Sequence, residues 1–198
     1  MKTIIKTMLL CAAATCFFSF VDFLTKIPET SLSPENFFSS VKELMLWVNK
    51  DMDNILPGAD DMASIKGDDY IGKTLDAIQK GTRTTATNGL WTQGNWGKLR
   101  HINQFFENCH KCKDDAIRAK YMGIEYFLRA WFYYEMLCYY GDVPFYDYVL
   151  SSDNQSSLMK ARDSRGFIAW KIISDLDNAA AALPETWPEG GAKVNKYA

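Results

Sequence analysis

Hydrophobic residues recur at the spacing of an α-helix in four stretches of the chain. One runs from Pro34 to the segment NILPGADD, and three span about residues 95–109, 114–140 and 164–183. Ser33 suits the N-cap of the first, and Pro34 suits its first turn. Residues 58–94 are irregular, with room for a short helix around residues 73–80. Because no run of residues favours a strand, the pattern predicts an all-α fold.

The stretch 114–140 is apolar on almost every side when it is drawn as a helix. Asp114 and Asp115 favour its start, Gly141 suits its C-terminal cap, and Pro144 prevents it from resuming. A helix of this kind is buried among neighbours. We therefore expect it to be the inner member of an antiparallel helical array with long irregular loops.

Composition excludes several classes of protein. The 198 residues carry a net charge of −2 with 23% charged side chains, which indicates neither nucleic-acid binding nor an acidic tail. Ten Tyr, twelve Phe and six Trp favour a folded domain over disorder.

The N-terminus has the pattern of a secretory signal. Lys2 and Lys6 precede an apolar stretch that begins at Met8. Ala13-Ala14-Thr15 before Cys16 resembles a bacterial lipoprotein box, so we predict a signal peptide over residues 1–15, lipidation at Cys16 and an extended linker over residues 16–33. Secretion without lipidation and a buried N-terminal helix are the alternatives.

Two of the other cysteines form the sequence CHKC at residues 109–112. The pair follows a helical run, whereas a redox dithiol usually lies at a helix N-terminus. A zinc site needs four ligands, and neither a second CxxC nor a suitably spaced His pair is present. We expect two thiols at a fraying helix end, able to form a disulfide in an oxidising compartment.

The sequence FLRAWFYYEMLCYYGDVP, residues 127–144, resembles the signature of the SusD/RagB family of Bacteroidetes outer-membrane nutrient-binding lipoproteins. Segments DFLTKIPETSLSPENFF, NWGKLRHINQFFEN and ARDSRGFIAWKIISDLDNAAAALP also resemble family segments, in the same order. The resemblance implies a tetratricopeptide-like helical repeat array over residues 34–198. It also implies that the chain is the N-terminal portion of a longer family member.

The resemblance further implies a binding protein rather than an enzyme, with no cofactor. Family members are anchored in the outer membrane by a lipid and cover a TonB-dependent transporter that imports glycans or peptides. On this reading the helices hold the core and dock on the SusC-like transporter, and the loops bind an oligosaccharide or peptide. Arg129 and Asp142 are expected to be structural partners within the fold.

Glycan sites pair exposed aromatic rings with polar groups that bind hydroxyls, and the irregular stretch offers both. The candidate ligand-binding residues are Asp68, Asp69, Tyr70, Arg83, Asn88 and Trp91. Trp96 lies on the apolar stripe of the helix predicted over residues 95–109. It is therefore expected to be packed rather than free for a ligand.

Two other classes of function are alternatives to glycan binding. No recognisable nucleophile and base, carboxylate pair or metal set supports an enzyme. A helical protein-interaction module, or a peptide-binding surface lipoprotein without glycan binding, is compatible with the same helices.

Overall fold

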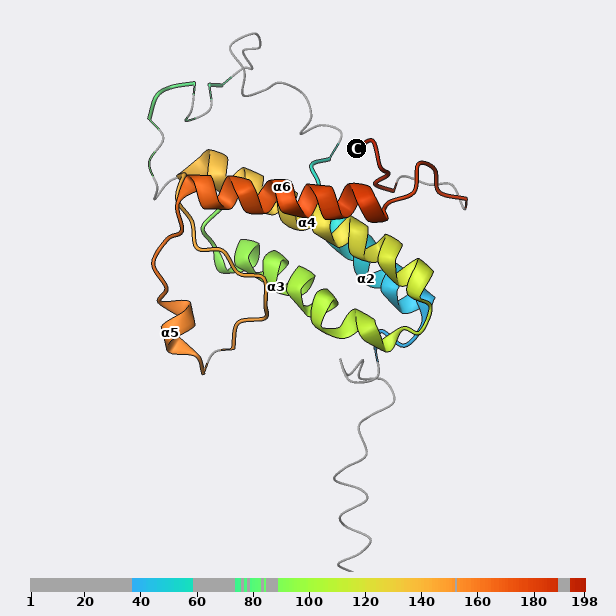
Figure 1. Cartoon of the computed structure of the whole chain (residues 1–198). Helices are drawn as coiled ribbons and strands as arrows, with labels where there is room; N and C mark the ends of the chain where they lie inside the picture. The colour runs from blue at the N-terminus through green and yellow to red at the C-terminus, as the bar shows by residue number, and fades with distance from the viewer. Residues whose placement is uncertain are drawn as a thin grey trace, which may run out of the picture. The chain divides into compact units, whose positions relative to one another are not determined.

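The structure is a computed structural model that describes residues 37–58, 74–75, 77, 79–82, 84, 89–151, 153–188 and 193–198 (Figure 1). The chain divides into two compact units, Met1–Phe37 and Phe38–Ala198. Apart from Phe37, every described residue belongs to the second unit, so the fold reported below is the fold of Phe38–Ala198.

The second unit is built from helices. They are α2 (Val41–Ile55), α3 (Gln93–Asn108), the 3₁₀ helix η1 (Cys109–Lys111), α4 (Asp115–Tyr140), the short α5 (Gln155–Leu158) and α6 (Arg165–Ala182). In the described part of the chain the only strand-like pairing is an isolated bridge between Val143 and Asp163. The prediction of an all-α fold is confirmed.

Local capping signals fix the ends of the two longest helices where the sequence predicts them. The Asp114 carboxylate accepts the backbone N–H of Ile117 at the start of α4, and the Ser164 hydroxyl accepts the N–H of Phe167 at the start of α6. Gly141 caps the end of α4 with φ 72°, a conformation that favours glycine.

The predicted start of the first helix is wrong. Residues 37–40 form a turn, and the helix begins only at Val41. Ser40 is its N-cap: the Ser40 hydroxyl accepts the Glu43 N–H, and the Glu43 carboxylate accepts the Ser40 N–H. Phe38 in the turn has φ 80° and is fully buried against Trp47 and Phe105.

The short helix considered around residues 73–80 is not found either. The described residues of that stretch form turns and irregular backbone. The short helix α5, conversely, lies in the connection between α4 and α6, where the sequence pattern predicts no helix.

Helix α4 is the centre of the unit, with α6, α2 and α3 packed against it (Figure 1). Helices α4 and α6 are antiparallel, because Gly123 near the start of α4 approaches Leu183 and Gly141 at its end approaches Arg165. The close packing of these two helices favours glycine at position 123, because a Cβ there would lie 3.1 Å from atoms of Ala182 and Leu183.

One side of α4 remains uncovered, which corrects the expectation that neighbours enclose it on all sides. Tyr134 is 53% exposed and Cys138 is also exposed. A stripe of exposed apolar residues also follows the outer face of α6. Its members are Phe167, Trp170, Ile173 and Leu176. Among the described residues, no helix is long and apolar enough to cross a membrane.

Candidate functional site

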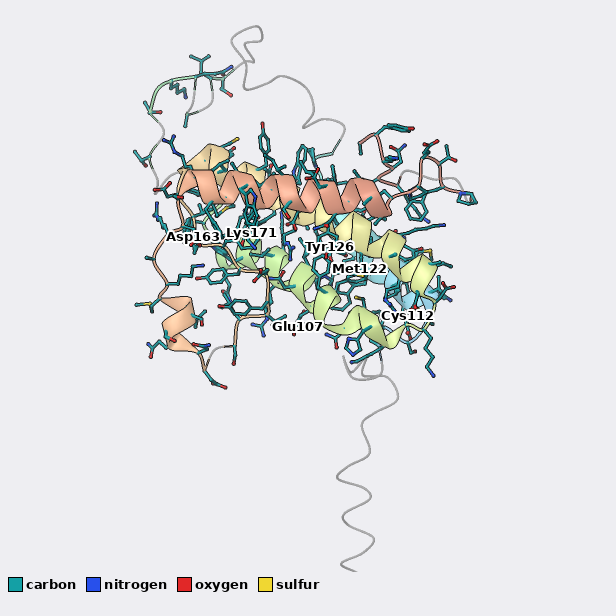
Figure 2. The ribbon with its side chains drawn as sticks, viewed as in Figure 1. Glu107, Cys112, Met122, Tyr126, Asp163 and Lys171 are labelled. Carbon is teal, nitrogen blue, oxygen red and sulfur yellow. The ribbon has the colours of Figure 1, made fainter. Side chains whose placement is uncertain are left out.

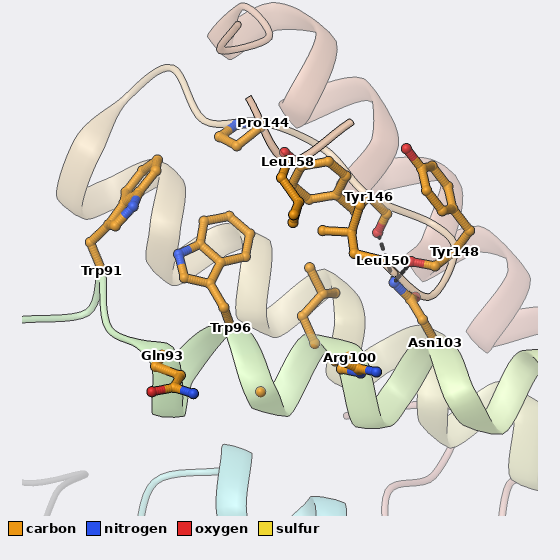
Figure 3. A pocket seen from close by; sticks show the side chains of 12 residues that line it. Trp91, Gln93, Trp96, Arg100, Asn103, Pro144, Tyr146, Tyr148, Leu150 and Leu158 are labelled. Carbon is orange, nitrogen blue, oxygen red and sulfur yellow. Dashed lines mark hydrogen bonds between the residues drawn. The ribbon is translucent and has the colours of Figure 1, made fainter. Parts of the chain in front are cut away.

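The candidate site is a pocket of about 620 Å³ between the first half of α3 and the segment that follows α4. This volume lies within the range usual for small-molecule sites. Figure 3 shows Trp91 and Trp96 at one end of the pocket and Asn103 and Tyr148 at the other. Its lining comprises Trp91, Gln93, Trp96, Gly97, Leu99, Arg100, Asn103, Pro144, Tyr146, Tyr148, Leu150 and Leu158.

One wall of the pocket is a face of α3. Gln93, Trp96, Arg100 and Asn103 recur at three- and four-residue intervals, so they lie in a row along the helix. Thr92 starts the helix by accepting the Asn95 N–H with its hydroxyl. The pocket therefore extends along the first three turns of α3, starting at the positive end of the helix dipole.

The opposite wall is the segment from Pro144 to Leu150, which a set of hydrogen bonds fixes in place. The Asp142 carboxylate accepts the N–H of Arg165, and the Asp163 carboxylate accepts the N–H of Phe145. Asp142 is thus the structural partner that the sequence predicts. Burial alone would raise the pKa of Asp163, but hydrogen bonds from Lys160 and from the Phe145 N–H lower it.

Asn103 joins the two walls. Its side-chain Nδ2 donates to the carbonyl oxygens of Tyr146, at 3.1 Å, and Tyr148, at 3.0 Å (Figure 3). The side chain is almost fully buried, and its Oδ1 has no hydrogen-bond partner in the described part of the protein. This oxygen is closed off from solvent, so the role of Asn103 in the pocket is to hold the two walls together through its Nδ2 bonds.

Aromatic rings contribute to the apolar lining of the pocket beside several aliphatic side chains. Trp91 is 40% exposed and Tyr148 is 42% exposed. Trp91 packs edge-on against Trp96 and Tyr140, and the Arg162 guanidinium lies 5.0 Å from its ring centroid. Its backbone N–H donates to the Tyr140 hydroxyl, which holds the residue in position. The rings thus offer apolar faces in fixed orientations.

Trp96 is half-buried and packs against Phe132 and Tyr146, as the sequence predicts. It nevertheless lines the pocket with its remaining surface. Packing in the core and contact with a ligand are therefore not exclusive for this residue.

Only one of the predicted ligand-binding residues can be compared with the pocket. Trp91 lines it, whereas Tyr70, Asp68, Asp69, Arg83 and Asn88 lie outside the described residues, as does the lipidation site Cys16. Gln93, Arg100, Asn103 and Tyr148 line the pocket but were not among the predicted residues. The first three share a face of α3 by their helical spacing, but nothing local in the sequence shows that this face meets the Tyr146–Tyr148 backbone.

The two CHKC thiols lie at the far end of α3 from the pocket, where Cys112 is labelled in Figure 2. Cys109 and Cys112 are free and buried. Burial raises the pKa of the Cys109 thiol, which is the reverse of what activates a thiolate. Within the described residues no group of three or more His, Cys, Asp or Glu side chains could hold a metal ion.

The pocket residues are suited to binding. None of the twelve lining residues is a His, Cys, Ser, Asp, Glu or Lys, so these side chains include no recognisable nucleophile with its base. What they offer is aromatic surface with a few fixed polar groups, the usual composition of a ligand site. The described part of the chain is therefore a helical domain with a pocket of the composition usual for ligand sites.

Comparison with known families places the chain within one of them. A family profile described as SusD-like, starch-binding and associating with the outer membrane, matches residues 22–198. The chain belongs to the SusD-like family, as its signature residues indicate.

Individual relatives agree with this assignment. SusD-like protein P2 of Formosa agariphila is 24% identical over 180 residues, covering 82% of this chain and 35% of that protein. A SusD-like protein from Bacteroides fragilis has a similar structure, with a TM-score of 0.64 at 20% identity over 86% of this chain and 35% of that one.

A second Bacteroides fragilis structure, of a SusD-like carbohydrate-binding protein, gives a TM-score of 0.59 at 16% identity, covering 81% of this chain. These structural likenesses confirm the tetratricopeptide-like helical fold. The chain spans about a third of the length of these relatives, 35% in each case.

Proposed function

We propose that the chain forms part of a surface lipoprotein that binds an oligosaccharide for uptake through a TonB-dependent outer-membrane transporter. The observation that carries this proposal is the α3 pocket, in which the exposed rings of Trp91 and Tyr148 line the same cavity as the exposed polar side chains of Gln93 and Arg100. Apolar faces of sugar rings stack on aromatic side chains, and sugar hydroxyls form hydrogen bonds with amide and guanidinium groups. The family description, starch-binding, agrees with the same class of ligand.

The binding proposal is tested by calorimetry with a panel of neutral and acidic oligosaccharides. Trp91→Ala should weaken binding of any bound sugar by about fivefold or more, because about 1 kcal/mol of ring contact is lost. Trp170→Ala is the matched control: Trp170 is 60% exposed on α6 and does not line the pocket. Equal affinities for the two variants would contradict a glycan site in this pocket.

The anchoring proposal concerns the residues before the described unit. We propose cleavage after residue 15, acylation of Cys16 and a linker over residues 16–33 that leads to the helical domain. The mass of the mature protein from a Bacteroidetes host should show both cleavage and acyl chains, and the protein should be in the outer-membrane fraction. Cys16→Ala should abolish acylation. An unmodified soluble product from the parent sequence would contradict the anchor.

The transporter proposal follows from the family's position at the outer membrane. Purification of the tagged protein from its own membranes should recover a TonB-dependent transporter in a stable complex. Recovery of the acylated protein without any such transporter would contradict this part of the proposal and leave glycan binding standing.

A second candidate function is a peptide-binding or protein-interaction module. The exposed α6 stripe of Phe167, Trp170, Ile173 and Leu176 favours it, because a contiguous apolar surface often marks an interaction site. Binding of peptides without binding of any oligosaccharide in the same panel, with loss on Trp170→Ala, would favour this function over the first.

A further inference from the structure

The charge of the α3 pocket is unbalanced. Arg100 lines it, is exposed, and makes no hydrogen bond or ion pair with any described residue. Arg162 lies against Trp91 at the edge of the pocket, and the structure shows no acidic partner for it among the described residues. None of the twelve lining residues is acidic.

Charged groups near the pocket lie outside its lining. Lys160 is 5.5 Å from the Tyr146 ring, and it is paired with Asp163 at 2.7 Å. The carboxylates of Asp142 and Glu107 keep their charge, but they accept the backbone N–H groups of Arg165 and Val149 and do not line the pocket. The start of α3 adds the positive end of a helix dipole. The groups that line or border the pocket therefore include two guanidinium groups and a helix N-terminus, and the described lining includes no carboxylate.

Arg100 is the charged side chain among the lining residues, and it presents hydrogen-bond donors in a planar fork that matches a carboxylate or sulfate group. Asn103, less than one turn further along α3, is buried and holds the wall through its bonds to the Tyr146 and Tyr148 carbonyl oxygens. A ligand suited to this pocket carries an anionic group for Arg100 and apolar ring faces for Trp91 and Tyr148.

We propose that the pocket selects acidic oligosaccharides, those carrying uronic-acid carboxylates or sulfate esters, over neutral ones. This inference rests on the proposed glycan-binding function and narrows it to a class of ligand. The anionic group binds Arg100, with Arg162 adding to the attraction, and the sugar rings stack on Trp91 and Tyr148.

The test compares trigalacturonate, a sulfated galactose oligosaccharide and maltotriose by calorimetry on the full chain. Trigalacturonate or the sulfated sugar should bind at least about tenfold more tightly than maltotriose, since a hydrogen bond to a charged group is worth this much. The two acidic sugars distinguish a carboxylate from a sulfate. Affinity for the acidic sugar should also fall as salt is raised, because exposed charges are screened.

Two variants and a control locate the effect. Arg100→Gln should weaken binding of the acidic sugar by about tenfold and change maltotriose binding little. Arg162→Gln should have a smaller effect in the same direction. Lys113→Gln removes the same charge beside Cys112, at the opposite end of α3 (Figure 2), and should leave all affinities unchanged. Thermal melts verify that each variant is folded.

Each outcome bears on a different statement. Equal or tighter binding of maltotriose, with no effect of Arg100→Gln, overturns the acidic-ligand inference and leaves glycan binding intact. A tenfold loss for Lys113→Gln as well overturns the local role of Arg100. No binding of any sugar overturns the proposed function, and this inference with it.

Discussion

Glu125 and Arg129 are buried ionisable residues one turn apart on α4, and they differ in whether the charged group has a hydrogen-bond partner. Arg129 makes two hydrogen bonds of 2.7 Å to the Asp175 carboxylate on α6, and its guanidinium lies 4.7 Å from the Phe106 ring centroid. Both carboxyl oxygens of Glu125 lack a hydrogen-bond partner when the group is ionised, and the nearest acidic neighbour is Asp51 on α2.

The difference follows from what each group can do when water is removed. A guanidinium cannot lose its charge in a protein, so it must be paired with an anion. A carboxyl group can bind a proton instead. Burial, and then the charge of Asp51 and a hydrogen bond to it, raise the pKa of Glu125 well above its ordinary value. A protonated Glu125 donates to Asp51, whose other oxygen lies 2.6 Å from His101 Nδ1.

Tyr133, one turn beyond Arg129, extends the comparison to an uncharged group. Its hydroxyl accepts the Tyr146 N–H at 2.7 Å and lies 3.3 Å from the Tyr146 carbonyl oxygen, to which it donates. Three residues in one row of α4 therefore avoid the cost of burial in different ways. Glu125 binds a proton, Arg129 pairs with the Asp175 carboxylate, and the Tyr133 hydroxyl bonds to the backbone of Tyr146.

The largest predicted effect comes from breaking the ion pair. Asp175→Ala leaves the Arg129 charge buried without its partner and should lower the free energy of unfolding by about 3–5 kcal/mol. Urea denaturation measures the change. Asp177→Ala is the matched control, because Asp177 is exposed on the same helix and should stay within about 0.5 kcal/mol of the parent.

A double variant sharpens this prediction. Arg129→Met with Asp175→Leu removes both charges and should be less destabilised than Asp175→Ala alone, since no uncompensated charge remains. If Asp175→Ala were no more harmful than Asp177→Ala, the Arg129–Asp175 ion pair would not be buried as its exposed fractions indicate.

The next effect in size concerns Tyr133. Tyr133→Phe leaves the buried Tyr146 N–H without an acceptor and should cost about 1–3 kcal/mol. Because Tyr146 is part of the pocket wall, the variant should also weaken ligand binding. Tyr134→Phe, which changes the exposed neighbour, should alter neither quantity. Weakened stability with unchanged binding would show that the pocket wall is held by other contacts, such as the Asn103 amide.

Local signals in the sequence account for much of this architecture. Asp114, Gly141 and Ser164 mark the ends of α4 and α6 by capping, which depends only on adjacent residues. The start of α2 was missed because Ser33-Pro34 and Ser40-x-x-Glu43 are both valid signals. The burial of Phe38 against Trp47 and Phe105 decides between the two capping signals. This burial depends on the packing of α2 on α3, which the local sequence does not show.

The pocket was harder to predict for the same reason. A structural partner for Arg129 was expected, but its identity, Asp175, depends on how α4 and α6 pack. Asn103 and Arg100 are ordinary polar residues on a helix until the backbone of Tyr146 and Tyr148 meets that helix. Trp91, which lines the pocket, could be selected from the sequence because a large aromatic residue in a polar loop is not easily part of a core; its role in ligand binding stays a prediction.

The smallest effect, and the one that depends on pH, comes from Glu125. A carboxyl group with a raised pKa in the folded state binds more protons folded than unfolded. The free energy of unfolding therefore falls as pH rises above the ordinary value of 4.5, and it levels off above the folded pKa. The groups that act on Glu125 are Asp51 and Cys109, which raise its pKa, and Arg129, which lowers it.

Glu125→Gln removes this titration while keeping the shape of the side chain. The variant should match the parent below about pH 4 and become more stable than the parent by about 1 kcal/mol or more as pH approaches about 8, since each pKa unit corresponds to about 1.4 kcal/mol. Urea denaturation at three pH values measures the difference, with the exposed Glu185→Gln as a control that should show none. A Glu125→Gln variant that is less stable than the parent at every pH would mean that the ionised carboxylate is favourable, and the contrast between Glu125 and Arg129 would then be lost.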